Sequence, residues 1–135
     1  MKIAKEVGKF EMKHKLLFFM LVLIATILIV RFSIAYIFDP NPKILGLELH
    51  HFDYGLLLLI VTVLFMLFVG KYERAYLALC SIAIALIVDE LWFIRKQIGG
   101  NNPEIYNPSF PYAIILAMII VFLAFLLSSL FKKKK

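Results

Sequence analysis

The chain has 135 residues, of which 63% are hydrophobic, and its mean hydropathy is +0.93. An ordinary globular domain contains about 45–50% apolar residues, so this composition excludes a water-soluble fold and indicates that lipid is the main solvent. The formal net charge of +6 would suit nucleic acid, but the basic residues gather at the ends of apolar runs. That placement is typical of membrane proteins, and we therefore expect a lipid bilayer as partner and no nucleic acid.

The apolar runs leave room for four membrane spans, joined by short loops, and for no separate soluble domain. The expected spans are 16–38, 50–70, 72–94 and 110–131. The fold class predicted is therefore all-α, an integral membrane four-helix bundle in one domain, 16–131. An N-terminal interfacial amphipathic arm, 1–15, precedes this domain, and a basic tail, 132–135, follows it.

The arm and the first span carry the first informative charges. Residues 1–15 contain five lysines, and Ile3, Val7 and Phe10 recur between them at helical spacing. A narrow apolar stripe opposite lysines predicts a short helix lying at the membrane surface. The following span has one charged residue, Arg31, which lies about 10 Å below the far end at the helical rise. A guanidinium at that depth either snorkels to the surface or pairs with a carboxylate.

The second span opens with a group of ionisable side chains. His50, His51 and Asp53 lie at the start of the helix, where unpaired amides and the helix dipole favour the Asp53 carboxylate. Asp53 is equally well the helix N-cap, with no chemical role. At about 100° per residue, His50 shares a face with Asp53 and Tyr54, whereas His51 points elsewhere.

The third span must contain Asp89 and Glu90, because the uncharged run before them has only about 14 residues and is too short to cross a membrane. Small residues recur on the same helix at steps of three and four: Ala75, Ala78, Ser81 and Ala85. Such a stripe lets helix backbones approach each other, so this face is expected to lie inside the bundle. Asp89 continues the stripe, and Glu90 lies one step round the helix.

The fourth span carries no charge, and we expect it to be a wall of the bundle rather than part of a site. Orientation follows from the basic residues. Eleven lysines and arginines fall in the arm, the 71–74 turn and the tail, and only three fall in the other two loops. Because positively charged loops stay in the cytoplasm, we expect a multi-pass protein of the cell membrane with both termini cytoplasmic. The polar residues then lie in the outer half of the membrane.

Antiparallel neighbours bring the start of the second span level with the end of the third, so the polar residues share one layer. This predicted cluster consists of Arg31, His50, His51, Asp53, Asp89 and Glu90. Charged groups inside a span are costly and are functional hypotheses by default. One interpretation is a divalent-metal site for zinc, iron or manganese, with the two histidines and the three carboxylates as ligands. A second is structural, with Arg31 in an ion pair with Asp89 or Glu90. A third is a proton or ion path.

These interpretations imply different functions. An enzyme would use a metal-activated water, with Asp89 or Glu90 as ligand or base, on a lipid or another membrane-soluble substrate. A non-catalytic protein would be a packing or assembly subunit, with another membrane protein or a second copy of itself as partner. Adjacent residues on a regular helix diverge by about 100°, so His50 and His51 bind one ion only if the helix start is irregular. A histidine that is hydrogen-bonded to Asp89 or Glu90 favours the structural interpretation.

The residues that carry a resemblance are His50, His51 and Gly55 at the opening of the second span, and Asp89 and Glu90 late in the third. In this pattern of His-His-x-x-x-Gly followed by Asp-Glu, the chain resembles an uncharacterised family of small four-span membrane proteins of bacteria and archaea. The family pattern has a further histidine where this chain has Glu48, and a basic motif before the last span that this chain lacks. The resemblance implies a polar cluster at these positions and names no reaction. The two departures argue against carrying over a metal site.

Overall fold

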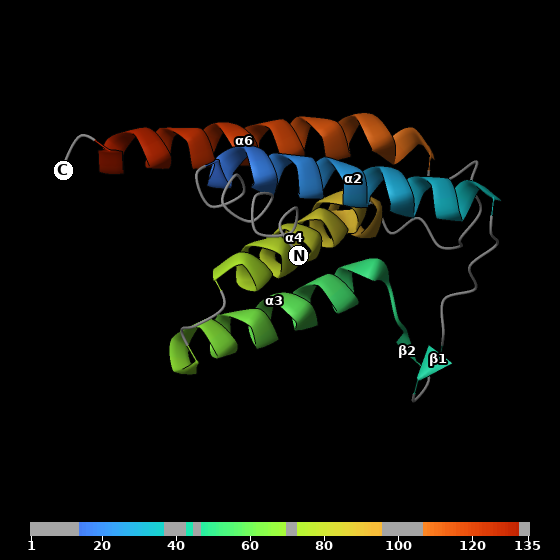
Figure 1. Ribbon diagram of the computed structural model, residues 1–135. Helices are drawn as coiled ribbons and strands as arrows, with labels where there is room; N and C mark the ends of the chain where they lie inside the picture. Colours follow the sequence, from blue (N-terminus) through green and yellow to red (C-terminus); the bar gives the residue numbers. More distant parts are fainter. Residues whose placement is uncertain (1–13, 37–42, 45–46, 70–72, 96–106, 133–135) are drawn as a thin grey trace, which may run out of the picture.

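The computed structural model describes residues 14–36, 43–44, 47–69, 73–95 and 107–132. Within them, four long helices follow one another in alternating directions (Figure 1): α2 (Lys15–Tyr36), α3 (His51–Phe68), α4 (Glu73–Arg95) and α6 (Phe110–Lys132). All four are long and apolar enough to cross a membrane. The chain is thus an all-α four-helix membrane protein, which confirms the fold class predicted from composition.

The described parts of the connections contain only short elements. Between α2 and α3, a two-residue strand β1 (Lys43–Ile44) pairs antiparallel with β2 (Leu47–Glu48). A single turn of 3-10 helix, η1 (Asn107–Ser109), leads into α6. The predicted amphipathic arm and the end of the basic tail lie outside the described residues, apart from His14, Lys15 and Lys132.

The central element is α4. In Figure 1 it lies between α3 on one side and the pair α2 and α6 on the other, and it packs against all three. By contrast, α2 and α6 make few contacts with each other, and α3 packs extensively only against α4. Small side chains make this central position possible, because they let neighbouring backbones approach closely. The fully buried residues of α4 include Ser81, Ala83, Ala85 and Asp89.

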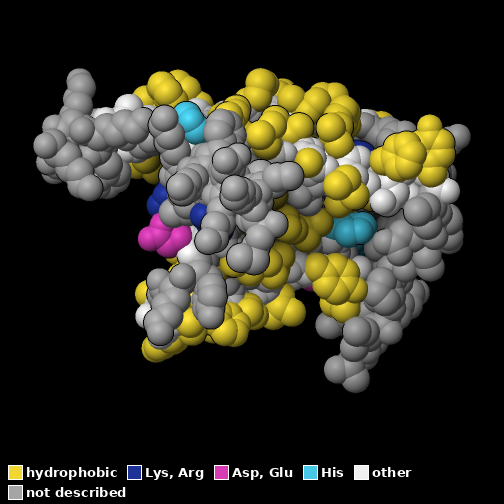
Figure 2. Space-filling model, viewed as in Figure 1, with side chains coloured by type: hydrophobic (Ala, Val, Ile, Leu, Met, Phe, Trp, Pro, Cys, Tyr) yellow, Lys and Arg dark blue, Asp and Glu magenta, His cyan; other side chains and the backbone are white. Residues whose placement is uncertain are grey.

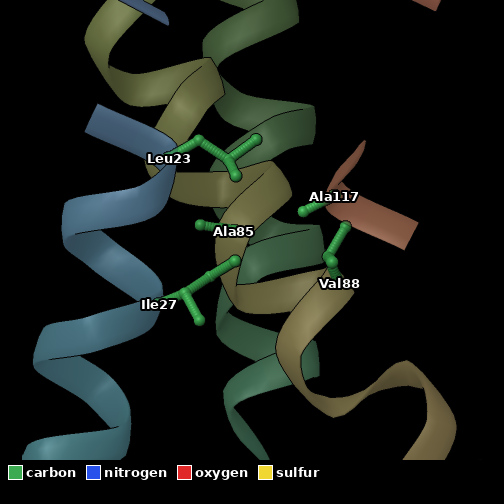
Figure 3. Close-up of a cluster of buried hydrophobic side chains, with 5 residues drawn as sticks. All are labelled: Leu23, Ile27, Ala85, Val88 and Ala117. Atoms are coloured by element: carbon green, nitrogen blue, oxygen red, sulfur yellow. The ribbon is translucent and has the colours of Figure 1, made fainter. Parts of the chain in front are cut away.

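Two faces of α4 serve different neighbours. The first face packs against α2 and α6 in a small hydrophobic core (Figure 3), which consists of Leu23, Ile27, Ala85, Val88 and Ala117. The second face receives Gly55 of α3, where a Cβ atom would come within 2.8 Å of the Ala83 carbonyl oxygen. The predicted small stripe is therefore buried at Ser81 and Ala85, whereas its first member, Ala75, is exposed.

Most of the remaining apolar surface faces outward. Hydrophobic side chains cover much of the described surface in Figure 2, and charged side chains form only small patches. The outer face of α3 alone exposes Leu57, Leu67 and Phe68. Soluble monomers rarely expose contiguous apolar patches larger than a few hundred Å², so the surrounding medium of these helices is the hydrocarbon of a bilayer.

Candidate functional site

Apart from Thr62 and Ser81, which lie midway along α3 and α4, the buried polar residues are found at one end of the bundle, where α2 and α4 finish and where α3 and α6 begin. At the same end, the rings of Trp92 and Tyr112 stack with centroids 4.1 Å apart. Tryptophan and tyrosine are enriched at the boundary between hydrocarbon and water. The stacked pair therefore indicates that the cluster is at the end of the bundle nearest one membrane surface.

Arg31 and Asp89 form an ion pair between α2 and α4. Arg31 Nε donates to Asp89 Oδ1 at 2.6 Å, and Arg31 Nη2 donates to the Asp89 backbone carbonyl at 3.1 Å. The two side chains are 9% and 0% exposed, so both charges are removed from solvent. An unpaired charge at this depth would be costly, and the pairing offsets much of that cost. The structure thus brings Arg31 to the first of the two carboxylates proposed as its partner.

The last helix also contributes to this site. Arg31 Nη2 donates to the hydroxyl oxygen of Ser109 at 3.0 Å, and the guanidinium carbon lies 5.3 Å from the centre of the Phe110 ring. A guanidinium over an aromatic face is attracted by the ring quadrupole. The expectation that the fourth span is only a wall is therefore wrong at its first residue, because Phe110 lies against the Arg31 guanidinium where the end of α2 meets the start of α6.

Glu90 binds the start of α3. Its Oε1 lies 2.8 Å from Nδ1 of His50, and its Oε2 accepts a hydrogen bond from the backbone amide of Phe52 at 2.7 Å. The Glu90 side chain is 3% exposed and the His50 side chain 26%. The first amides of a helix have no partner within the helix, and the dipole there favours an anion. Glu90 therefore acts as a cap for α3 that is supplied by the neighbouring helix, not as a partner of Arg31.

Asp53 caps the same helix from within. Its Oδ2 accepts a hydrogen bond from the backbone amide of His50 at 2.9 Å. The N-cap residue is His50, with extended backbone, and Asp53 is the third helical residue. The suggestion that Asp53 is itself the N-cap is thus wrong in position, although its role is capping. A carboxylate three residues into a helix that reaches back to the N-cap amide is the second half of a capping box.

The two adjacent carboxylates of α4 serve different helices. Neighbouring residues of a helix diverge by about 100°, so Asp89 faces α2 and α6 while Glu90 faces α3. The cluster is consequently two hydrogen-bonded networks that meet at α4. The first links Arg31, Asp89, Ser109 and Phe110, and the second links His50, Phe52, Asp53 and Glu90.

This arrangement bears on metal binding. Among the described residues, no group of three His, Cys, Asp or Glu side chains is placed to hold a metal ion. His50 and Glu90 lie close together, but His51, which is half-buried in the first turn of α3, does not complete a three-ligand group with them. The proposed ligand set of His50, His51, Asp53, Asp89 and Glu90 therefore finds no support in the geometry.

Sequence reasoning missed Ser109, Phe110 and the amide of Phe52. A backbone amide leaves no trace in a sequence. Ser109 did leave a signal, because a serine just before a helix with Pro111 in its first turn is typical of an N-cap. That signal indicates a helix start at the same membrane surface as Arg31, but it does not indicate that the hydroxyl binds a guanidinium.

Comparisons with protein-family models, with curated proteins and with solved structures found no match to this chain. The function is therefore argued from these residues and their contacts.

Proposed function

We propose that this protein is a non-catalytic structural or assembly subunit that spans the membrane. Its polar cluster fixes the relative positions of its four helices. One observation carries this proposal: the adjacent carboxylates Asp89 and Glu90 are each bound by a different neighbouring helix. In addition, no buried side-chain nitrogen or oxygen among the described residues lacks a hydrogen-bond partner. A catalytic or ligand-binding cluster is expected to keep some of these groups for its substrate.

The alternative of a metal-dependent enzyme has less support. Both Glu90 oxygens already have protein partners, the His50 ring and the Phe52 amide, and Asp89 Oδ1 is held by Arg31 at 2.6 Å. A divalent ion would have to displace these donors, and a shared ion also requires three or more ligands within about 2.0–2.3 Å. The capping role of Glu90 and the ion pair of Asp89 explain why acidic residues occur in this span without a metal.

The proton-path alternative also has less support. From Glu90, the next buried polar side chain along α4 is Ser81, nine residues and about 13 Å away at the helical rise. Between them Gly55 of α3 packs against Ala83 so closely that even a methyl group would not fit. The Ser81 hydroxyl donates to the Leu77 carbonyl of its own helix. The described polar groups thus do not continue from the cluster toward the other end of the bundle.

The proposed setting is the cell membrane, with both termini in the cytoplasm and the cluster near the outer surface. The excess of lysine and arginine in the sequence before the first span, between the second and third spans and after the fourth supports this orientation. The structural role also implies a partner. Because α3 borders only α4 extensively, its outer face remains for lipid, for another membrane protein or for a second copy of the chain.

The proposal is tested by metal analysis combined with thermal unfolding. Protein purified in mild detergent without added metal is expected to be folded and to contain no stoichiometric zinc, iron or manganese. Glu90→Gln is expected to lower the unfolding temperature, because the start of α3 loses a carboxylate. Interhelical hydrogen bonds in membranes are worth about 0.6–2 kcal/mol, and a similar loss of stability is expected here.

Tyr54→Ala provides the matched control, since Tyr54 lies in the same first turn of α3 and is 42% exposed. It should affect stability less than His50→Ala. One metal ion per chain that is lost in His50→Ala or Glu90→Gln would overturn the structural proposal and favour a metal centre.

A further inference from the structure

An apolar groove runs between α2 and α6. Its volume is about 580 Å³, and all the residues that line it are hydrophobic. Leu23, Ile27 and Ala117 form the floor, where they also belong to the core with α4 (Figure 3). The groove exists because α2 and α6 both pack against α4 and make few contacts with each other.

The groove runs parallel to the helices, as the acyl chains of a bilayer do, and its length is comparable to that of an acyl chain. On α2 its lining extends from Leu16 to Leu28, a distance of about 18 Å at the helical rise. Helices that cross a membrane lie broadly along the bilayer normal, which is also the direction of the acyl chains. A groove of about 580 Å³ lies within the common range for small-ligand sites, about 300–1,000 Å³.

The walls of the groove favour an acyl chain over a transmembrane helix. Helices associate in membranes through small residues that let their backbones approach closely. Here the walls carry bulky side chains such as Ile24, Met118 and Phe122, and alanine occurs only on the floor. A flexible chain of methylene groups can follow such a surface, and unbranched methionine side chains can adapt to it.

The two ends of the groove differ in charge. At one end, α2 begins at Lys15 and α6 ends at Lys132, after which the sequence continues with three more lysines. The Lys15 side chain is 54% exposed, although its Nζ lies 2.8 Å from Glu73 Oε2. At the other end Arg31 is bound to Asp89 and Ser109 and is nearly buried. Basic residues at the end of a membrane helix attract anionic lipids, so the lysine end complements a negatively charged headgroup.

We propose that the groove between α2 and α6 binds one acyl chain of an anionic phospholipid, with the phosphate headgroup at the lysine end. The site shares only Phe110 with the polar cluster. Its failure would leave the structural role of Asp89 and Glu90 untouched.

Native mass spectrometry of protein released from nanodiscs of equimolar phosphatidylglycerol and phosphatidylcholine tests this site. One retained phospholipid per chain is expected, with phosphatidylglycerol favoured at least about fivefold, the ratio that one well-placed lysine supplies. Met118→Trp places an indole in the groove and should reduce lipid retention by a similar factor. Lys15→Gln, next to the lining residue Leu16, should lower the preference for phosphatidylglycerol and leave total retention unchanged.

Leu123→Trp is the matched control, because Leu123 is on the same helix, is 51% exposed compared with 58% for Met118, and does not line the groove. It should retain lipid as the unaltered protein does. Equal retention of the two lipids, or unchanged retention in Met118→Trp, would overturn the proposal. A dimer in which cysteines introduced at Ile24 cross-link would assign the groove to a second copy instead.

Discussion

At the scale of single residues, the buried charges are explained by where each one finds its partner. Asp89 has a cation, Arg31, while Glu90 has the amide-rich start of a helix together with the His50 ring. Both arrangements supply hydrogen-bonding partners to a carboxylate that is buried away from water. Arginine suits its position because its planar group presents several donors at once, and here they reach Asp89, its carbonyl and Ser109.

The Arg31 ion pair gives the first prediction. Arg31→Met leaves Asp89 buried and unpaired, and breaking a buried pair in this way costs about 3–5 kcal/mol. We expect a clear drop in the unfolding temperature in detergent, measured by circular dichroism. The double variant Arg31→Met with Asp89→Asn should recover part of the loss, because it removes both charges.

Glu73→Gln serves as the control for an ion pair at the surface. Glu73 pairs with Lys15 at the opposite end of the bundle, where both side chains are largely exposed. Exposed pairs contribute little to stability, so this variant should unfold close to the temperature of the unaltered protein. An Arg31→Met protein as stable as Glu73→Gln would contradict the account of a buried, stabilising pair.

The sequence allows part of this site to be predicted at the residue scale. The depth of Arg31 in its span and the position of the Asp89–Glu90 pair in the third span are enough to predict that Arg31 pairs with one of these carboxylates, but not with which one. The partner of Glu90 is not predictable in the same way. It depends on the exact path of the chain into α3, which places the Phe52 amide toward α4. Ser109 and Phe110 are uncharged, so charged residues within the spans, which indicate the rest of the polar cluster, do not point to them.

At the scale of helices, the contact between α3 and α4 is the most extensive one among the described residues. Gly55 makes it possible, because a side chain there would meet Ala83, Leu86 and Ile87 of α4 at 3.0 Å or less. The glycine lies one turn below the capped start of α3, so this contact also sets the distance between Glu90 and the Phe52 amide. Packing and hydrogen bonding at this end of α3 therefore depend on each other.

This dependence gives the second prediction. Gly55→Ala forces α3 away from α4, and overpacking of this kind costs about 1–3 kcal/mol. Thermal unfolding should show this loss of stability. Glu90→Gln should destabilise the Gly55→Ala protein less than it destabilises the unaltered protein, since the hydrogen bonds of Glu90 are already weakened in Gly55→Ala. Leu57→Ala is the control, because Leu57 lies on the exposed face of the same helix. Strict additivity of Gly55→Ala and Glu90→Gln would contradict the coupling.

The helices themselves are the most predictable part of the structure, because length and continuous hydrophobicity decide them. The start of α3 is an example: the sequence predicts it at residue 50, and the structure has His51 as the first helical residue. Which helix packs against which is less predictable. All four spans are apolar, and only the small residues of the third indicate that it is the central one.

At the scale of the whole molecule, the charges at the two ends determine orientation. At the lysine-rich end α2 begins, α6 ends and Lys15 pairs with Glu73, whereas the opposite end holds the polar cluster with the stacked Trp92 and Tyr112. An excess of basic residues is retained in the cytoplasm. The expected arrangement therefore has the cluster close to the outside of the cell.

Cysteine labelling of intact cells tests this orientation, in a Cys80→Ala background. A membrane-impermeant maleimide should label Pro108→Cys, which is exposed at the cluster end, and should not label Arg74→Cys, which is exposed at the lysine end. After the cells are permeabilised, both should react. Labelling of Arg74→Cys alone in intact cells would reverse the orientation.

The central position of α4 has a consequence for how the protein enters the membrane during synthesis. This helix carries two carboxylates in its last turns, and an acidic residue deep in a span opposes insertion from the translocon. Its counter-groups, Arg31 and the start of α3, lie earlier in the chain and so reach the bilayer first. Insertion of α4 is therefore assisted by helices that are already in place. A chain truncated after Arg95 should integrate all three of its helices, whereas α4 expressed behind an unrelated pair of spans should integrate poorly.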